Sequence, residues 1–301
     1  MTETTTPSIE SLLNAHRLWL TNPDQGRRAN FYGATMNDAD LRGADLSRGI
    51  LSAVTMLDAN LSGVDFTGAR LDRADLQRAN LVNADLTEAD LTNAVLSAAW
   101  LTNANLSEAK MHGTVLKKAR LENSRMLDAG VQDSNFREVI ATGASFHQSR
   151  FYQADFTESK LDRAVFYHAR LQHCHFRDAS AVGANFGGSK IDHCDFTGVK
   201  LNDAKFLRGE ILECNFRDAD IRGADFREAR MRGGDFCRAV LAGARFAEAK
   251  MLSADFRGAN LQGAREMSSE QLLQARTDET TTLPNGSRGP YIKYSGAEKF
   301  R

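Results

Sequence analysis

The sequence predicts an all-β solenoid whose backbone winds in four-sided coils around a thin apolar core. A large apolar residue recurs at every fifth position from Phe31 to Leu261. The side chain two residues before each large one is always small, most often Ala. From Phe136 to Phe256 the large residue is Phe at every tenth position, which a coil of 20 residues would place on two of its sides.

A period of five matches neither the α-helix nor a plain β-strand. Within each unit, however, the small and large residues are two apart, like same-side positions on an extended segment. The two polar residues that follow are rich in Gly, Asn, Asp and Ser, which turn the chain. Each unit is therefore one side and one corner of a coil. Ala141 and Ala181 stand where large residues are expected, so we predict a deformed coil near 139–141.

The whole-chain properties exclude several classes. The formal net charge is -1, from 38 basic and 39 acidic residues, so direct nucleic-acid binding is not expected. We find no apolar run long enough for a transmembrane segment and no secretory signal at the N-terminus, which favours a cytoplasmic protein. Export by a route without a cleaved signal stays open. Four cysteines in 301 residues do not form a disulfide framework.

The repeat units resemble those of the pentapeptide-repeat family. Ala39-Asp40-Leu41-Arg42-Gly43 has the A-[DN]-L-x-x form, and the resemblance covers roughly residues 27–265. It implies a right-handed quadrilateral β-helix, and 47 units at four per coil would make nearly twelve coils. The flanking segments resemble those of bacterial members, which implies a bacterial protein. The fold says little about function, because one fold serves many roles.

The N-terminal flank predicts a capping helix and turn over 8–26, after a disordered tail at 1–7. Ile9, Leu12, Leu13, His16 and Leu20 share one helical stripe, and Ser8 is the expected N-cap. The helix is expected to cover the exposed edge of the first coil, where backbone groups would otherwise be unpaired.

The C-terminal flank predicts a second capping helix over 266–276, with Ser268 at its start. Residues 277–301 are polar and rich in turn formers, so we expect a flexible tail. The predicted domain order is therefore tail, helix, β-helix over 27–265, helix, tail.

Cysteine and histidine residues first suggest a metal site. His173-Cys174-His175 is followed one coil later by His193-Cys194-Asp195. Cys174, Cys194 and Cys214 occupy the inward small position, whereas the histidines face outward and cannot converge on one ion with them. We predict no metal site, no cofactor and no catalytic residues, since no nucleophile or phosphate-loop signature is present.

Surface charge offers the best candidate site. The residues just before the large position form a basic stripe on one side and an acidic stripe on the next. The candidate interaction residues are Arg150, Arg170, Lys190, Arg230 and Lys250, with Asp90 and Glu210 interrupting the same side. Trp100, beside Val95 and Val115, is a second candidate, as an exposed apolar patch. The alternative is that both are ordinary solvated surface.

We expect a non-enzymatic scaffold that presents charged faces of a rigid rod to an unknown protein partner. Two alternatives come from the resemblance: a DNA-mimicking protein that protects gyrase, and the targeting module of a secreted effector. Gyrase protectors of this family tend to be acidic and dimeric, whereas this chain is nearly neutral. The oligomeric state is left open between a monomer and an end-to-end dimer.

Overall fold

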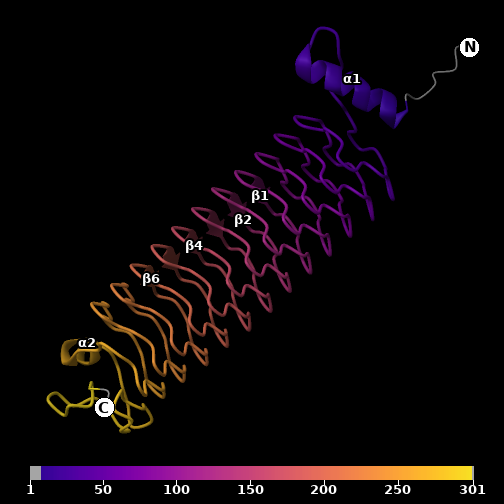
Figure 1. Ribbon diagram of the computed structural model, residues 1–301. Helices are drawn as coiled ribbons and strands as arrows, with labels where there is room; N and C mark the ends of the chain where they lie inside the picture. Colours follow the sequence, from indigo (N-terminus) through magenta and orange to yellow (C-terminus); the bar gives the residue numbers. More distant parts are fainter. Residues whose placement is uncertain (1–7, 300–301) are drawn as a thin grey trace, which may run out of the picture.

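The protein is a parallel β-solenoid that extends along one axis, as Figure 1 shows for the computed structural model. The structure describes residues 8–299. Parallel bridges pair residues twenty positions apart, from Asn30 with Ile50 to Arg245 with Arg265. They recur at every fifth residue and so form four ladders along the rod, which confirms the predicted solenoid. None of the helices in residues 8–299 has the length and apolar character that crossing a membrane requires.

One ladder includes short strands, which together form a six-stranded parallel sheet with neighbours in chain order. The strands are β1 (Lys110–His112), β2 (Gly130–Gln132), β3 (Arg150–Tyr152), β4 (Arg170–Gln172), β5 (Lys190–Asp192) and β6 (Glu210–Leu212). Their registers are successive, so that Arg150 pairs with Arg170 and Arg170 with Lys190. The middle residue of each strand is buried, and its two neighbours face outward.

Asp and Asn side chains stabilise the corners of the coils. The Asp65 carboxylate accepts a hydrogen bond from the Thr67 backbone N–H at 2.8 Å, and Asp195 accepts one from Thr197 at 3.0 Å. The corner residue three positions after each of these Asp residues adopts a positive φ, which is 61° at Gly68 and 67° at Gly198. In these contacts, Asp residues just before the large position stabilise the turn that follows them.

The core is built from the predicted small and large residues. Phe196 lies between Phe176 and Phe216, with ring centroids 4.7 and 4.8 Å apart and nearly parallel planes. Phe186, on the other Phe stack, meets Phe196 edge to face at 6.1 Å. Both arrangements are favourable for aromatic quadrupoles, so each ring is held by its own stack and by the opposite one.

The predicted deformation near residues 139–141 is wrong. Ala141 donates its N–H to the Lys160 carbonyl at 2.7 Å, and the bridge from Ile140 to Lys160 is regular. Phe151 replaces the aliphatic residue expected ten positions later, and its ring contacts Phe146 edge to face at 5.7 Å. The coil therefore keeps its regular backbone path through Ala141.

Helix α1 (Ile9–Thr21) lies at the N-terminal end of the solenoid (Figure 1). Leu12 and Leu13 pack against the core, and His16 is fully buried. The His16 Nδ1 accepts a hydrogen bond from the Ala29 N–H at 3.0 Å, so its Nε2 donates to the Ser47 carbonyl at 2.9 Å. A neutral imidazole satisfies both backbone groups, and burial lowers the pKa of His16.

Helix α2 (Ser269–Gln274) lies at the C-terminal end (Figure 1). Ser268 and Gln271 form a capping box at its start. The Gln271 amide also donates to the carbonyls of Phe246 and Ala249, at 2.7 and 2.9 Å. The Phe246 carbonyl also accepts from the Ala249 N–H at 3.0 Å, so Gln271 is its second donor, and this one side chain joins the helix to the coil beneath it.

The sequence predicts a flexible tail at 277–301, whereas the described part, to residue 299, continues the solenoid. Arg276 bridges to Asp255, and Thr282 bridges to Asn260. Thr281 and Leu283 are buried, and the Thr281 hydroxyl donates to the Phe256 carbonyl at 3.1 Å. Because α2 is inserted here, the bridged residues are more than twenty positions apart in the sequence. The five-residue pattern therefore does not extend into this coil. The predicted tail at 1–7 lies outside the described residues.

Replacing Phe196 with Ala should lower the free energy of unfolding by about 3–5 kcal/mol, because the substitution leaves a cavity and removes three aromatic contacts. The matched control is Lys200→Ala in the same coil, which removes an exposed side chain. Its effect should stay under about 0.5 kcal/mol. Equal shifts of the two urea midpoints would contradict the assigned inward and outward faces.

The attachment of α1 should weaken in mild acid. Because burial lowers the His16 pKa in the folded state, its stabilisation is complete above the unfolded pKa of about 6.5 and is lost as pH falls toward the lowered value. His16→Gln keeps one donor and one acceptor without a titratable group. The hydrogen-exchange protection factors of the α1 amides should therefore fall below about pH 6 in the parent protein but not in H16Q. The same pH dependence in both proteins would exclude His16 as the cause.

Candidate functional site

The cysteines form an inward ladder. Cys174, Cys194 and Cys214 are buried and free, and the Cys174 N–H lies 3.4 Å from the Cys194 Sγ. Burial raises the pKa of the Cys174 and Cys194 thiols well above the ordinary value. Neutral thiols packed on backbone carbonyls are small core residues, which agrees with the prediction from their register.

The outward histidines next to this ladder lie close together. The rings of His173 and His193 have centroids 5.3 Å apart. His193 Nδ1 contacts the Asp192 carboxylate at 2.7 Å. Within residues 8–299, no three or more His, Cys, Asp or Glu side chains are grouped so that they could hold a metal ion.

The five predicted basic residues lie on the ladder that includes the strands. Arg150 in β3, Arg170 in β4 and Lys190 in β5 are consecutive rungs. After Glu210 in β6, the bridges add Arg230 and Lys250 in turn. We call these five residues the basic ladder.

The charges of the basic ladder are compensated unevenly. Glu210 lies between two of its members, 3.7 Å from Lys190 and 3.3 Å from Arg230. Arg150 and Arg170 make no ion pair with any residue of 8–299. The two arginines are on adjacent rungs, whose backbones are about 4.8 Å apart in a sheet of this kind, so two positive charges without an ion pair among residues 8–299 follow one another along the ladder.

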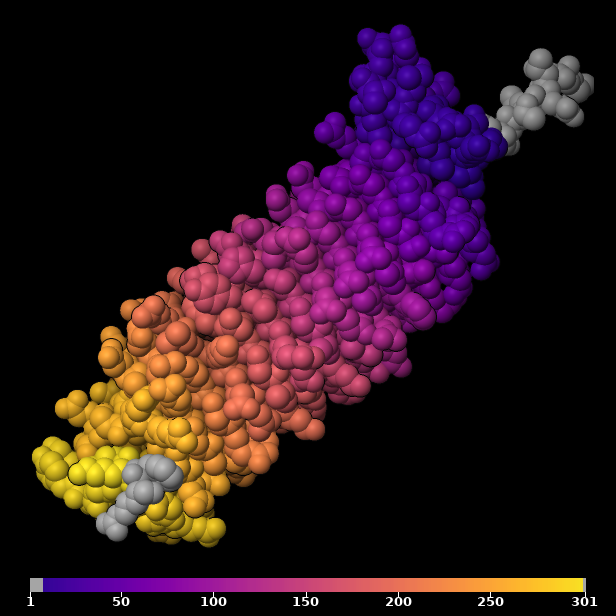
Figure 2. All heavy atoms as spheres, viewed as in Figure 1, coloured from indigo at the N-terminus to yellow at the C-terminus, as the bar shows by residue number. Residues whose placement is uncertain are grey.

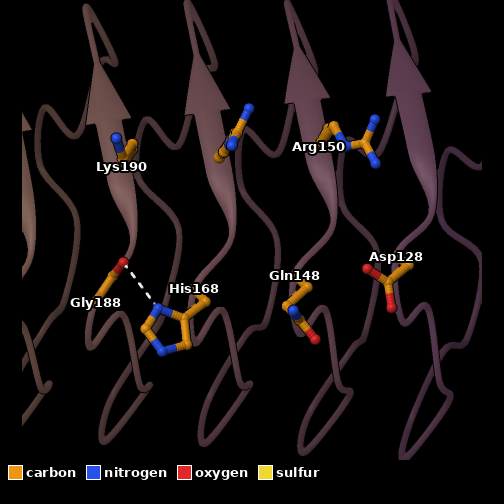
Figure 3. Close-up of a pocket in the computed structure, with 7 residues that line it drawn as sticks. Asp128, Gln148, Arg150, His168, Gly188 and Lys190 are labelled. Carbon is orange, nitrogen blue, oxygen red and sulfur yellow. Dashed lines mark hydrogen bonds between the residues drawn. The ribbon is translucent and has the colours of Figure 1, made fainter.

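A second row of side chains runs beside these arginines. Figure 3 shows Asp128, Gln148, His168 and Gly188, one from each coil, in a row alongside Arg150 and Lys190. The two rows border an open groove of about 580 Å³ that Arg170 also lines. His168 Nδ1 lies 3.2 Å from the Gly188 carbonyl oxygen and donates to it.

Gly188 keeps this groove open. Its φ of +61° is shared by Gln148 and His168 at the equivalent corners, so the backbone does not require glycine here. A Cβ at residue 188 would lie 2.6 Å from the His168 ring. The missing side chain therefore makes room for His168 at the groove.

The row formed by Asp128, Gln148, His168 and Gly188 was not predicted from the sequence, because charges were compared only at the position before each large residue. The twenty-residue spacing of positions 128, 148, 168 and 188 was the available signal. It shows that these positions stack beside the basic ladder.

The predicted acidic stripe is largely neutralised. Its carboxylates pair with arginines from a row beside it: Asp155 with Arg137 at 3.4 Å, Asp195 with Arg177 at 3.0 Å, Asp235 with Arg217 at 2.5 Å and Asp255 with Arg257 at 2.7 Å. Hydrogen bonds from Arg257 hold the pKa of Asp255 at about 2. This side of the rod therefore presents ion pairs rather than a net negative charge.

Trp100 is 53% exposed and lies on the ladder two corners away from the basic ladder. The Arg120 guanidinium lies 5.8 Å from its ring centroid, in a cation–π contact. Val95 and Val115 are half-buried. The structure thus separates Trp100 from the basic residues, and it stays a separate candidate.

No concave site as deep as a typical enzyme pocket is visible on the face in Figure 2, which shows a rod with a continuous surface. The hollows along residues 8–299 are open grooves between outward side chains. Such shallow surfaces suit contact with another macromolecule better than enclosure of a small substrate.

Comparison with known proteins gives a family match over most of the chain. The model described as pentapeptide repeats (8 copies) matches residues 26–52, 57–93, 89–126, 194–233 and 235–265. A model described as a pentapeptide repeat region matches residues 139–206. No curated protein sequence matches the chain.

Solved structures are similar at low identity. HetL, a pentapeptide repeat protein involved in heterocyst differentiation regulation from the cyanobacterium Nostoc sp. strain PCC 7120, is 23% identical, with 94% of this chain and 100% of that chain covered and a TM-score of 0.31. A form of QnrB1, a plasmid-mediated fluoroquinolone resistance protein, is 17% identical, with 67% and 90% covered and a TM-score of 0.49. These similarities are too weak to transfer functional residues.

The four thiols should be unreactive in the folded protein. All four are buried, and burial together with Asp235 and Asp255 raises the pKa of Cys237 to about 12. A disulfide reagent at pH 8 should label none of them until denaturant unfolds the chain, and then all four. Rapid labelling of Cys174, Cys194 or Cys214 in the folded protein, identified by mass spectrometry, would contradict the inward ladder.

Proposed function

The chain belongs to the pentapeptide-repeat family, and on this premise we propose that it is a non-enzymatic scaffold whose rod presents charged faces to another protein. The basic ladder is the proposed contact: Arg150, Arg170, Lys190, Arg230 and Lys250. One observation carries the proposal. Arg150 and Arg170 are adjacent, exposed and without an ion pair among residues 8–299, whereas the neighbouring acidic side is compensated.

The energetic argument favours a bound partner. Like charges on adjacent rungs repel, and a surface needed only for solubility gains nothing from placing them together. An acidic surface on a partner would offset that repulsion and speed association through long-range attraction. The same attraction should weaken as salt is added.

The DNA-mimicking gyrase protector is less well supported. Mimicry of DNA requires an extended negative surface. Here four carboxylates of the acidic stripe, from Asp155 to Asp255, are paired with arginines. A targeting module of a secreted effector would need the same protein-binding face, and the charge-reversal experiment below would reveal its partner too.

We also infer the finer architecture: a right-handed, four-sided rod of nearly twelve coils, with helices capping both ends. The run of bridges from Asn30 to Arg265 and the contacts of His16 and Gln271 support it. The proposed location is the cytoplasm, and the proposed assembly is a monomer or an end-to-end dimer.

Reversing three charges of the basic ladder should slow association with the native partner. Arg150→Glu, Arg170→Glu and Lys250→Glu change the three members without an ion pair among residues 8–299. The partner, first identified by capture from native cell extract, should associate about tenfold more slowly at low salt. Thermal stability should hardly change, because surface substitutions usually cost less than about 0.5 kcal/mol.

The matched control is Arg125→Glu, Lys160→Glu and Arg163→Glu. It changes net charge equally, at exposed positions outside the basic ladder. Its association rate should stay within about twofold of the parent rate, apart from the general effect of net charge. If both triple variants bind the partner as the parent does, the basic ladder is solvated surface, and Trp100 is the next residue to test.

A further inference from the structure

We propose that the groove between the Arg150–Arg170 pair and the Gln148–His168 pair binds the phosphate group of a phosphorylated protein. This deepens the proposed function and rests on it, since the phosphate would belong to the scaffold's partner. The groove combines two unbalanced guanidinium groups with an amide and an imidazole, all within two coils.

The charge of the groove matches a compact dianion. Each guanidinium offers planar donors that suit two phosphate oxygens at once. A phosphorylated side chain carries a charge of about -1.5 to -2 and three strong acceptor oxygens, so one such group can balance both arginines. Gln148 lies in the row beside the arginines and lines the same groove (Figure 3), so a phosphate bound there would also have an amide donor in the groove wall.

The spacing of the rungs disfavours a row of ordinary carboxylates. Adjacent rungs are about 4.8 Å apart, whereas same-face side chains of an extended peptide recur every ~6.7 Å. On a helix the nearest same-face residues are about 5–6 Å apart. The carboxylates of an acidic peptide that runs along the rod would therefore not align with both arginines. A single phosphate between the two arginines needs no such alignment.

The surroundings disfavour a long polyanion or a membrane. Asp128 lies at one end of the groove, and Glu210 follows two rungs after Arg170 on the other side. A nucleic-acid strand or an anionic bilayer would meet these carboxylates within a few coils. A short phosphorylated segment fits between them, so a phosphoprotein is the occupant that the charges favour.

The test uses N-acetyl-O-phosphoserine amide as the probe, titrated into the full chain while the arginine side-chain NMR signals are followed. Saturable binding is expected, and N-acetylserine amide should not bind. Arg150→Gln with Arg170→Gln should weaken phosphoserine binding by at least about tenfold. Asp128→Asn should strengthen it, because a like charge is removed from the groove.

The matched control is Arg125→Gln with Arg163→Gln, which removes two exposed arginines elsewhere and should change affinity by less than about twofold. Thermal unfolding of each variant checks that the fold is intact. The proposal is overturned if no saturable binding occurs, or if both arginine pairs matter equally. It is also overturned if vesicles containing phosphatidic acid bind through Arg150 and Arg170 while phosphoserine does not.

Different results would contradict the phosphate site and the scaffold function. If charge reversal of the basic ladder abolishes partner binding but phosphatase treatment of that partner does not, the scaffold stands and the phosphate site is wrong. If phosphoserine binds through the two arginines but the charge-reversed protein still binds its partner normally, the scaffold proposal fails at this face. Loss of binding in both experiments supports the phosphate site.

Discussion

Every coil of this protein can bury its inward side chains only against the coils before and after it. That constraint sets the repeat, because a residue must fit its counterpart twenty positions away on both sides. Phe196 satisfies it by stacking between Phe176 and Phe216. The backbone follows the same rule, with N–H donors of one coil meeting carbonyls of the next. Stability should then approximate a sum of contacts between neighbouring coils.

The same register orders the surface. Side chains one coil apart are close enough to form ion pairs, as Arg78 does with Asp58 and Arg238 with Asp218. Opposite charges at a spacing of twenty residues therefore neutralise each other, and like charges at that spacing stay unbalanced. The surface charge of the rod depends less on the total composition than on the order of signs along each ladder. Net neutrality is thus compatible with a local cationic groove.

The five-residue pattern predicted the parts that depend on one position at a time. The inward Phe residues, the buried cysteines and the alignment of the basic residues all follow from counting. The pattern did not predict contacts between different positions of neighbouring coils, such as Arg177 with Asp195. It also led to the wrong prediction of a deformed coil at Ala141, where the hydrogen bonds between coils are regular. The coil beyond α2 was hidden because the helix shifts the register, although hydrogen bonding continues to Thr282.

As the proposed scaffold, the rod would hold the backbone at its charged residues in fixed relative positions before any partner arrives. The backbone at Arg150 and Arg170 is fixed by ladder hydrogen bonds on both sides, and the residue that follows each arginine, Phe151 or Leu171, is buried. Ordering the backbone costs nothing further on binding, and only the ends of two side chains lose freedom. The repulsion between them is already present in the free protein, so an anion that fits relieves it. Stability of the rod and readiness to bind therefore have the same origin, which is the strict stacking of identical positions.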